Sequence, residues 1–272
     1  LRCHLCGHDE HAPLRCPQSA CQSPEIRFAG VGTERVEETL VKLYPRATLR
    51  RMDSDTLKKK EDYKRILTEF RQGKVDILIG TQMIAKGLHF PNVTLVGIIY
   101  ADLSLHIPDF RSGERTFQLI TQVAGRAGRG EVEGDVYVQS LTPFHPAIQY
   151  ARRHDYIGFY EQEWEFRQQT DYPPSRRLAL VTLRGLHEEK IRLSANHMRQ
   201  ALEQATTDLS GVSFSGPAPA PLERVENHYR FQILVRAHRM QRLSVCMAEV
   251  LQSLRLPEGV KVSVDIDPVN LC

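Results

Sequence analysis

Long hydrophobic runs, targeting segments and a phosphate-binding loop are all missing from this sequence. The apolar stretch 95–101 is far shorter than the ~18 residues of a membrane span, and it predicts a buried strand instead. The start has no initiator methionine, no signal-peptide core and no transit-peptide composition. We therefore expect a fragment of a longer cytoplasmic protein that contacts no membrane.

The missing phosphate-binding loop has the form G-x-x-x-x-G-K-[ST], in which backbone amides cradle the phosphates of a nucleotide. Without it we expect the chain alone to bind nucleotide poorly and to hydrolyse none. The composition excludes few other classes of protein, since 41% hydrophobic and 25% charged residues are typical of globular proteins. The 272 residues are enough for two domains, each with its own core, and a net charge of +3 by itself says almost nothing about nucleic acid.

Four of the six cysteines stand within the first 21 residues, as two pairs. Cys3 and Cys6 are separated by two residues and followed by a glycine, a spacing that lets both thiolates reach one tetrahedral zinc ion. Cys16 and Cys21 are separated by four residues, which is wider than usual and weaker evidence. Clustering of this kind favours a metal site in a reducing cytosol over a disulfide scaffold. Four unrelated free thiols are the alternative.

Residues 25–141 alternate between strand and helix patterns. Strands are expected at 26–29, 48–52, 75–79, 93–100 and 134–139, and helices at 34–43, 61–72 and 115–129. Thr33 is expected to cap the first of these helices. The alternation predicts a doubly wound α/β domain, with a parallel sheet, helices on both faces and ligands at the carboxyl ends of the strands.

The pattern of residues 142–174 predicts a helical connector. The Tyr-Pro-Pro stretch at 172–174 marks its end. In residues 175–272 strands are expected at 178–184, 212–214, 229–235 and 260–266, and helices at 187–205 and 241–254. The stretch 216–221, with prolines at alternate positions, is expected to be a stiff segment after a short strand. The order β-α-β-β-α-β is that of a ferredoxin-like α+β domain.

The stretch QVAGRAGR at 122–129 is the strongest local signal. If it is helical, Gln122, Arg126 and Arg129 lie at i, i+4 and i+7 on one face. The two glycines between them cost about 0.8–1 kcal/mol each in a helix, so close backbone packing must offset that cost. Guanidinium groups match phosphate oxygens, which indicates phosphate binding. A solvated basic helix end is the alternative.

Two turns fall where expected strands meet helices, GVGTE at 30–34 and GTQMIAKG at 80–87. Each exposes backbone amides and a hydroxyl at a helix start, an arrangement that favours an anion. Ordinary strand-to-helix connections would look the same. Either turn alone therefore supports an anion site and a simple connection equally well.

The stretch 122–129 also matches the last motif of superfamily 2 helicases, and TQMIAKG at 81–87 matches the motif before it. The longer run 109–129, the turn 30–34 and IGTQMIAKGLHFP at 79–91 resemble the bacterial replication-restart helicases, the PriA (primosomal protein N′) family. The resemblance covers nearly the whole chain and corresponds to the C-terminal half of such a protein. It implies a zinc-binding segment at 1–24, a RecA-like helicase lobe at 25–141, a helical connector at 142–174 and a ferredoxin-like domain at 175–272.

The activity that this resemblance implies is that of an ATP-dependent 3′→5′ DNA helicase that recognises stalled replication forks and initiates primosome assembly. In such enzymes the nucleotide and its Mg²⁺ lie between two RecA-like lobes. Arg126 and Arg129 would then reach the γ-phosphate as catalytic residues, and Gln122 and Gly87 would lie near the nucleotide. Arginines that act in this way are worth about 10³–10⁵ in rate.

The same resemblance implies DNA contacts in the lobe. Thr81 and Gln82 would touch phosphates of the tracking strand, and Gly30, Gly32 and Thr33 would lie on the same DNA face.

The family also holds two zinc ions, so the two cysteine pairs would be halves of sites completed upstream, with Cys3, Cys6, Cys16 and Cys21 as ligands. The implied partners are forked and single-stranded DNA, single-strand-binding protein and other primosome proteins. We expect a monomer in the bacterial cytoplasm, associated with the nucleoid.

Two other functions stay open. The chain could be a non-catalytic DNA- or protein-binding module, or part of another superfamily 2 DNA helicase. The zinc segment and the run 109–121 disfavour the second. The first would use basic residues of the C-terminal domain, although charge runs usually mark solvated faces; these residues are Arg176, Arg177, Arg184, Arg224, Arg230 and Arg236.

Overall fold

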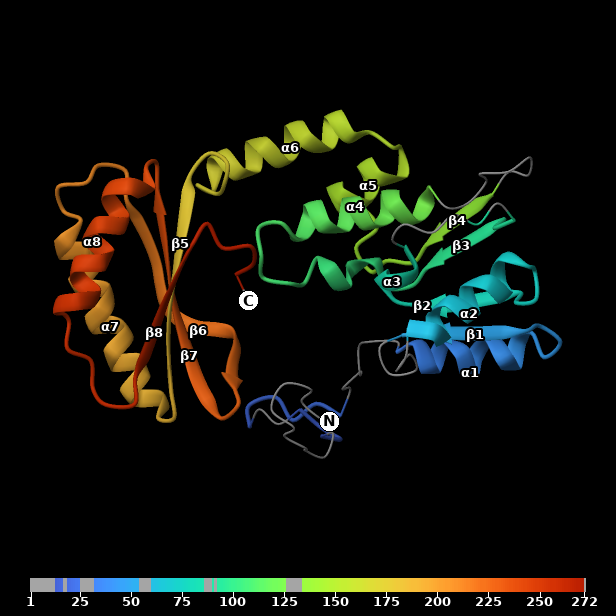
Figure 1. The fold of residues 1–272 in the computed structure, drawn as a ribbon, viewed down its shortest axis with the longest axis horizontal. Coiled ribbons are helices and arrows are strands. Elements are labelled where there is room, and N and C mark those ends of the chain that lie inside the picture. The colour runs from blue at the N-terminus through green and yellow to red at the C-terminus, as the bar shows by residue number, and fades with distance from the viewer. Residues whose placement is uncertain are drawn as a thin grey trace. The chain divides into compact units, whose positions relative to one another are not determined.

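The computed structural model describes residues 13–16, 19–24, 32–53, 60–85, 90, 92–125 and 134–271, and the chain divides into two compact units (Figure 1). The lobe unit comprises Arg27–Ile107 and Arg111–Tyr160. The C-terminal unit comprises Leu1–Ile26, Pro108–Phe110 and Glu161–Cys272. No helix in the described part of the chain has both the length and the hydrophobicity that a membrane span requires.

The described part of the lobe unit contains two pairs of parallel strands. β1 pairs with β2, so that Leu49 lies beside Ile77 and Met52 beside Gly80, and β3 pairs with β4 from Leu95–Asp135 to Ile98–Val138. The strands are β1 (Leu49–Met52), β2 (Ile77–Gly80), β3 (Leu95–Ile98) and β4 (Asp135–Val138). The helices are α1 (Thr33–Leu43), α2 (Lys60–Arg71), α3 (Gln82–Ala85), η1 (Ala101–Ser104), α4 (Ser112–Ala124), α5 (Pro146–Arg152) and the first residues of α6 (Tyr156–Gln169).

Two hydrophobic clusters hold these strands. Met52 at the end of β1 packs with Ile66 and Leu67 of α2. Phe117 of α4 stacks on Phe159 of α6, with ring centroids 4.4 Å apart and planes at 4°. In both cases the apolar face of an amphipathic helix covers short strands, as the helical spacing of these residues predicts. Parallel pairing and the alternation of strand and helix show a mixed α/β organisation. In the described residues the strands form two separate two-stranded sheets, so the single doubly wound sheet stays a prediction.

The C-terminal unit is built on one four-stranded sheet with the order β6-β7-β5-β8, in which all neighbours are antiparallel. The elements are β5 (Arg177–Gly185), α7 (Glu188–Ala205), β6 (Ser213–Val225), β7 (His228–Ala237), α8 (Met240–Ser253) and β8 (Lys261–Ile266). The predicted order β-α-β-β-α-β is therefore present. Figure 1 shows α7 and α8 on the same face of this sheet.

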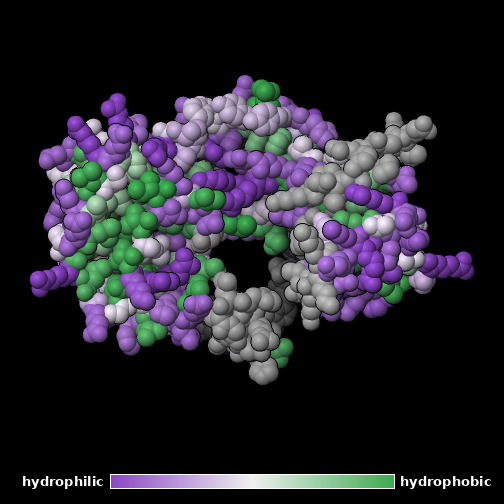
Figure 2. Space-filling view, viewed as in Figure 1, coloured by the Kyte–Doolittle hydropathy of each residue, from purple (hydrophilic) through white to green (hydrophobic). Residues whose placement is uncertain are grey.

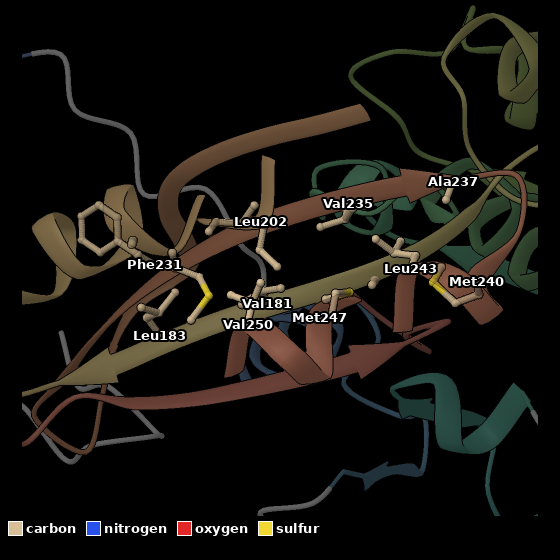
Figure 3. Packing of buried hydrophobic residues seen from close by; sticks show 14 of the residues in the cluster. Val181, Leu183, Leu202, Phe231, Val235, Ala237, Met240, Leu243, Met247 and Val250 are labelled. Atoms are coloured by element: carbon tan, nitrogen blue, oxygen red, sulfur yellow. The ribbon is translucent and has the colours of Figure 1, made fainter. Parts of the chain in front are cut away.

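The main core lies between this sheet and its two helices. Val181, Leu183, Ile233 and Val235 of the central strands are fully buried against α7 and α8. Figure 3 shows such side chains from strand and helix pointing toward one another. Leu193 and Val245, on the outer side of the helices, are more than half exposed, and Figure 2 shows hydrophobic residues among hydrophilic ones over these helices.

The opposite face of the sheet is apolar only at one end. Leu178 and Leu180 of β5 and Leu234 of β7 form a second, smaller cluster with Phe110 and Leu271. Because side chains alternate between the two faces of a strand, β5 is buried on both sides over this stretch. Asp109 accepts a hydrogen bond from the backbone N–H of Leu271 at 3.1 Å, which ties the short segment Pro108–Phe110 to this unit.

Two sequence predictions about element length are wrong. The helix predicted at 115–129 ends at Ala124, where Gly125 forms the C-cap and donates its N–H to the carbonyl of Thr121 at 3.0 Å. The strand predicted at 212–214 continues through the proline-rich stretch as β6, up to Val225. β6 lies at a sheet edge, and prolines two residues apart remove N–H groups from one side of the strand only, so pairing with β7 survives.

Candidate functional site

The candidate site lies at the carboxyl ends of β1 and β2. The register places Met52 beside Gly80, so the next residues, Asp53 and Thr81, leave neighbouring parallel strands at the same edge. α1 begins at Thr33, whose hydroxyl reaches the same edge. Ligands of parallel α/β sheets bind at this edge, because the loops that follow the strands meet there.

Asp53 organises this edge. Its side chain is 6% exposed, its carboxylate accepts a hydrogen bond from the Thr33 hydroxyl at 2.5 Å, and it lies 3.3 Å from Nε of Arg51. Nε of Arg51 is also 3.4 Å from a carboxylate oxygen of Glu37 on α1. A buried carboxylate needs a cation and hydrogen-bond donors to offset its lost hydration, and Thr33 and Arg51 supply them. The start of α1 is thereby fixed against the end of β1.

Gly80 lets the two strand ends approach closely. A Cβ atom at this position would lie 2.5 Å from the carbonyl oxygen of Met52 and 3.0 Å from the side chain of Ile84. Only a residue without a side chain fits there, so Gly80 sets where Thr81 and Gln82 leave the strand. Both of these side chains are exposed.

The structure describes part of the predicted set of site residues. Gly32, Thr33, Thr81 and Gln82 fall around this edge of the β1–β2 pair. Gln122 is exposed in the last turn of α4. The other predicted residues lie outside the described ranges: Cys3, Cys6, Gly30, Gly87, Arg126 and Arg129.

Two expectations about these residues need correction. Thr33 is not the cap of α1: Gly32 holds that position, without a side-chain hydrogen bond, and the Thr33 hydroxyl binds Asp53 instead. The helix that carries Gln122 ends at Ala124, five residues earlier than predicted, and the rest of the predicted stripe, Arg126 and Arg129, lies outside the described residues. Asp53, which the sequence analysis did not single out, is the residue that was missed. Its signal was a carboxylate directly after a strand beside a Gly-Thr turn.

A second buried carboxylate stands beyond the ends of β3 and β4. Asp102 accepts hydrogen bonds from the Ser140 hydroxyl at 2.7 Å, from backbone N–H groups of Leu141 at 2.8 Å and Thr142 at 3.0 Å, and from the Thr142 hydroxyl. Burial favours the neutral acid, but the bonds from Thr142, Ser140 and Leu141 outweigh it and hold the pKa of Asp102 well below its ordinary value. Asp102 is therefore an ionised anchor for the loop 140–142.

Two of the four predicted zinc ligands lie in the described residues. Cys16 is half-buried and Cys21 exposed, both with free thiols, and the N–H of Cys16 donates to the carbonyl of Ser23 at 2.9 Å. Two thiols are two of the four ligands that a tetrahedral zinc site requires. Among the described residues no group of three or more His, Cys, Asp or Glu side chains could hold a metal ion.

Comparison with known families divides the chain into two parts. The family "Helicase conserved C-terminal domain" matches residues 30–131, and the family "Primosomal protein N C-terminal domain" matches residues 168–269. The first range contains the β1–β2 site together with Arg126 and Arg129, and the second contains the whole antiparallel sheet.

Similar proteins match along nearly the whole chain. "Replication restart protein PriA" of Bacillus subtilis is 45% identical over 98% of this chain, that of Treponema pallidum 41% over 100%, and that of Synechocystis 39% over 100%. The chain covers 33%, 40% and 32% of those proteins, respectively, so it spans about a third to two-fifths of their length. With two matching domains in one order and these relatives, the chain is similar to the part of the PriA replication restart proteins that carries a helicase C-terminal domain and a primosomal C-terminal domain.

Proposed function

We propose that this chain supplies the second motor lobe and the C-terminal domain of an ATP-dependent 3′→5′ DNA helicase that recognises stalled replication forks and starts primosome assembly. The observation that carries this proposal is the order of a helicase C-terminal domain followed by a primosomal C-terminal domain. The sequence has no phosphate-binding loop of its own. The nucleotide-binding lobe would therefore come from outside these 272 residues.

In this proposal Arg126 and Arg129 reach the γ-phosphate held by the other lobe, and Gln122 and Gly87 lie near the nucleotide. Both arginines follow the C-terminal end of α4, a connection between a helix and the parallel strand β4. A guanidinium supplied from another lobe stabilises the charge that develops during phosphoryl transfer. ATP with Mg²⁺ supplies the phosphoryl group in the intact enzyme.

DNA phosphates would bind at the carboxyl ends of β1 and β2. Thr81 and Gln82 are exposed there and can donate hydrogen bonds to a phosphodiester. Gly30, Gly32 and Thr33 would contribute backbone N–H groups, because the Thr33 hydroxyl already donates its proton to Asp53. Movement of this edge with lobe closure would couple hydrolysis to translocation.

The cysteine pairs would bind zinc as a structural ion. Cys16 and Cys21 would supply two thiolates to one site and Cys3 and Cys6 two to another, with the remaining ligands from upstream residues. We expect zinc to copurify with the freshly reduced chain and chelation to loosen residues 1–24 without melting the lobe unit. Absence of metal in such a sample would contradict this assignment.

The proposed partners are forked and single-stranded DNA, single-strand-binding protein and other primosome proteins, with the protein acting as a monomer at the nucleoid. The relatives carry the name of replication restart proteins, which supports partners of this kind.

The decisive experiment substitutes one arginine in a protein that contains both this chain and the nucleotide-binding lobe. Arg129→Ala should lower DNA-stimulated ATP hydrolysis by at least about 100-fold while fork binding stays near wild type, since the lost interaction forms only in the transition state. Arg46→Ala is the matched control, because Arg46 is exposed and precedes β1, at the other end of that strand. Unchanged turnover in Arg129→Ala would reject the motor assignment and favour a non-catalytic binding module.

A further inference from the structure

The antiparallel sheet of the C-terminal unit has two edge strands of different kinds. β6 forms one edge and β8 the other, since the strand order is β6-β7-β5-β8. β6 contains Pro217, Pro219 and Pro221, which have no N–H group to donate to a further strand. β8, from Lys261 to Ile266, contains no proline. Because prolines protect an edge against pairing with another chain, β8 is the edge that stays open to such pairing.

The register of β8 shows which backbone groups its free edge presents. The N–H of Asp267, just after the strand, donates to the carbonyl of Leu178 on β5 at 2.8 Å. Backbone groups alternate in direction along a strand, so every second residue before Asp267 also faces β5. The residues between them face the free edge, and these are Val262, Val264 and Ile266. Within the described part of the chain, none of these three has a hydrogen bond on that side. A row of unpaired N–H and C=O groups is a template for a further strand.

The open-face side chains of β8 carry opposite charges at the two ends of the strand. Lys261, Ser263 and Asp265 are exposed on this face, whereas Val262 and Val264 between them are half-buried against the core. Lys261 and Asp265 are four residues apart, or ~13 Å, which is too far for an ion pair within the strand. Neither forms an ion pair elsewhere in the described residues. The edge therefore presents a cation at its start and a carboxylate near its end.

These charges complement one another when β8 pairs antiparallel with the β8 of a second copy. With the two-fold axis at Ser263, Lys261 lies opposite Asp265 of the second copy, and Asp265 lies opposite its Lys261. The same register places Val262 opposite Val264 of the second copy, so that their free N–H and C=O groups bond to one another. Opposite charges in such positions stabilise a strand pair. A parallel pairing in register would instead oppose like charges.

The neighbouring strand also favours a carboxylate beside Lys261. On β5 the residue beside Lys261 is Arg184, so two cations are adjacent in the sheet. Like charges in this position destabilise a sheet unless something neutralises them. The residue beside Asp265 on β5 is the apolar Leu180. A second copy thus supplies Lys261 with a carboxylate and Asp265 with a cation, which β5 provides to neither.

From this register and charge pattern we infer that β8 is a self-association edge, at which two copies of this chain join their sheets through antiparallel β8 strands. The contact is symmetric and closes with two copies. Six residues from each copy are far fewer than the about 20–30 a side of a stable interface, so the contact is weak. The chain is therefore a monomer in dilute solution, in agreement with the function proposed above, and pairs where copies are concentrated.

The test exchanges charges on the edge of the 272-residue chain. Lys261→Glu and Asp265→Lys each turn both opposed pairs into like charges, whereas a mixture of the two variants restores both pairs in a mixed dimer. Arg242→Glu and Glu249→Lys, at exposed positions of α8, make the same changes of charge away from the edge. Sedimentation equilibrium measures self-association between about 10 µM and about 1 mM protein. Thermal unfolding checks that each variant keeps its fold.

We expect wild type to associate reversibly to a dimer in this range. Each edge variant alone should associate at least about tenfold more weakly, since two charge pairs change sign, and their mixture should recover the association of wild type. The α8 variants should behave like wild type. A wild type that stays monomeric at the highest concentration would overturn the proposal and leave the edge to a strand of a different protein. A mixture that associates no better than its components would also overturn it.

A cysteine on the symmetry axis tests the register directly. Ser263 lies opposite Ser263 of the second copy, with Cα atoms ~4.5 Å apart, which is within the range that a disulfide spans. Ser263→Cys should therefore form more cross-linked dimer on mild oxidation than wild type, whose native cysteines set the background. Ser253→Cys, exposed on α8, is the control. Equal yields from the two variants would overturn this pairing, and no outcome bears on Arg129, whose test is hydrolysis.

Discussion

The two units of this chain use different means to hold their strands. The C-terminal unit has strands of six to thirteen residues, which pack around one cluster of 15 buried side chains. Each described strand of the lobe unit has four residues, and the hydrophobic clusters of that unit are smaller. In the lobe unit a buried carboxylate follows each described strand pair, Asp53 after β1 and Asp102 after β3. The C-terminal unit thus depends on apolar burial, and the lobe unit depends in addition on polar contacts at the strand ends, where its site lies.

The largest expected effect tests the apolar core of the C-terminal unit. Leu243→Ala should lower the free energy of unfolding by about 2–5 kcal/mol, because Leu243 is fully buried and its loss leaves a cavity. Leu193→Ala is the control, since Leu193 is 57% exposed. Hydrogen exchange should report the loss in residues 177–266 and leave the lobe unit protected. Equal loss of protection in both units would mean that they do not have separate cores.

The next effect tests the carboxylate of the lobe unit. Asp102→Asn should destabilise that unit by about 2 kcal/mol, because an amide cannot accept all the bonds that the carboxylate accepts. Asp76→Asn should cost less, because the Asp76 carboxylate is exposed and accepts a backbone hydrogen bond from the N–H of Thr48. Denaturant unfolding of the two variants measures the difference.

The same variant has a defined pH dependence. The pKa of Asp102 is lowered in the folded protein, so its stabilisation is complete above the unfolded pKa of ~4 and is lost progressively as pH falls from there through the lower folded pKa. The stability difference between wild type and Asp102→Asn should therefore shrink as pH falls from 7 to below ~4. A difference that grows with acidity would contradict the ionised state of Asp102.

A smaller effect tests the close approach at the site. Gly80→Ala places a Cβ atom 2.5 Å from the Met52 carbonyl, and we expect a loss of about 1–3 kcal/mol and a displaced Thr81. Gly97→Ala, in a strand of the same unit, meets nothing within 4 Å and should be neutral or stabilising. Thermal unfolding distinguishes the two, and similar midpoints would show that strand glycines here have no steric role.

The smallest effect tests the bond between α1 and β1. Thr33→Val keeps the shape and removes the hydroxyl that Asp53 accepts, so the lobe unit should lose about 1 kcal/mol. Thr33→Ser keeps the donor and should recover most of it. DNA affinity should change little in either variant, since the hydroxyl is already engaged. A strong affinity loss in Thr33→Val alone would mean that it contacts DNA directly.

Local pattern predicted most of the elements of this chain. The alternation of strands and helices up to β4 and the order of elements from β5 to β8 both follow from hydrophobic spacing and turn residues. The errors fall where local preference and context disagree. Prolines argued against a strand at 216–221, but an edge position tolerates them, and the repeat of small residues at 124–128 resembled a helix that Gly125 ends.

The site shows the same division. Gly80, Thr81 and Gln82 could be chosen from sequence, because a strand followed by Gly-Thr at a helix start is a local signal. The role of Asp53 could not, because its partner Thr33 is 20 residues away.

Sequence by itself determined the order of the helices and strands, their amphipathic faces and the family motifs. Each of these depends only on residues that are close to one another in the sequence. Tertiary structure alone decided which polar groups meet: Thr33 with Asp53, and Asp102 with the loop 140–142. The physical reason is that hydrophobic burial follows local periodicity, whereas electrostatic contacts depend on distances that only strand pairing and packing set.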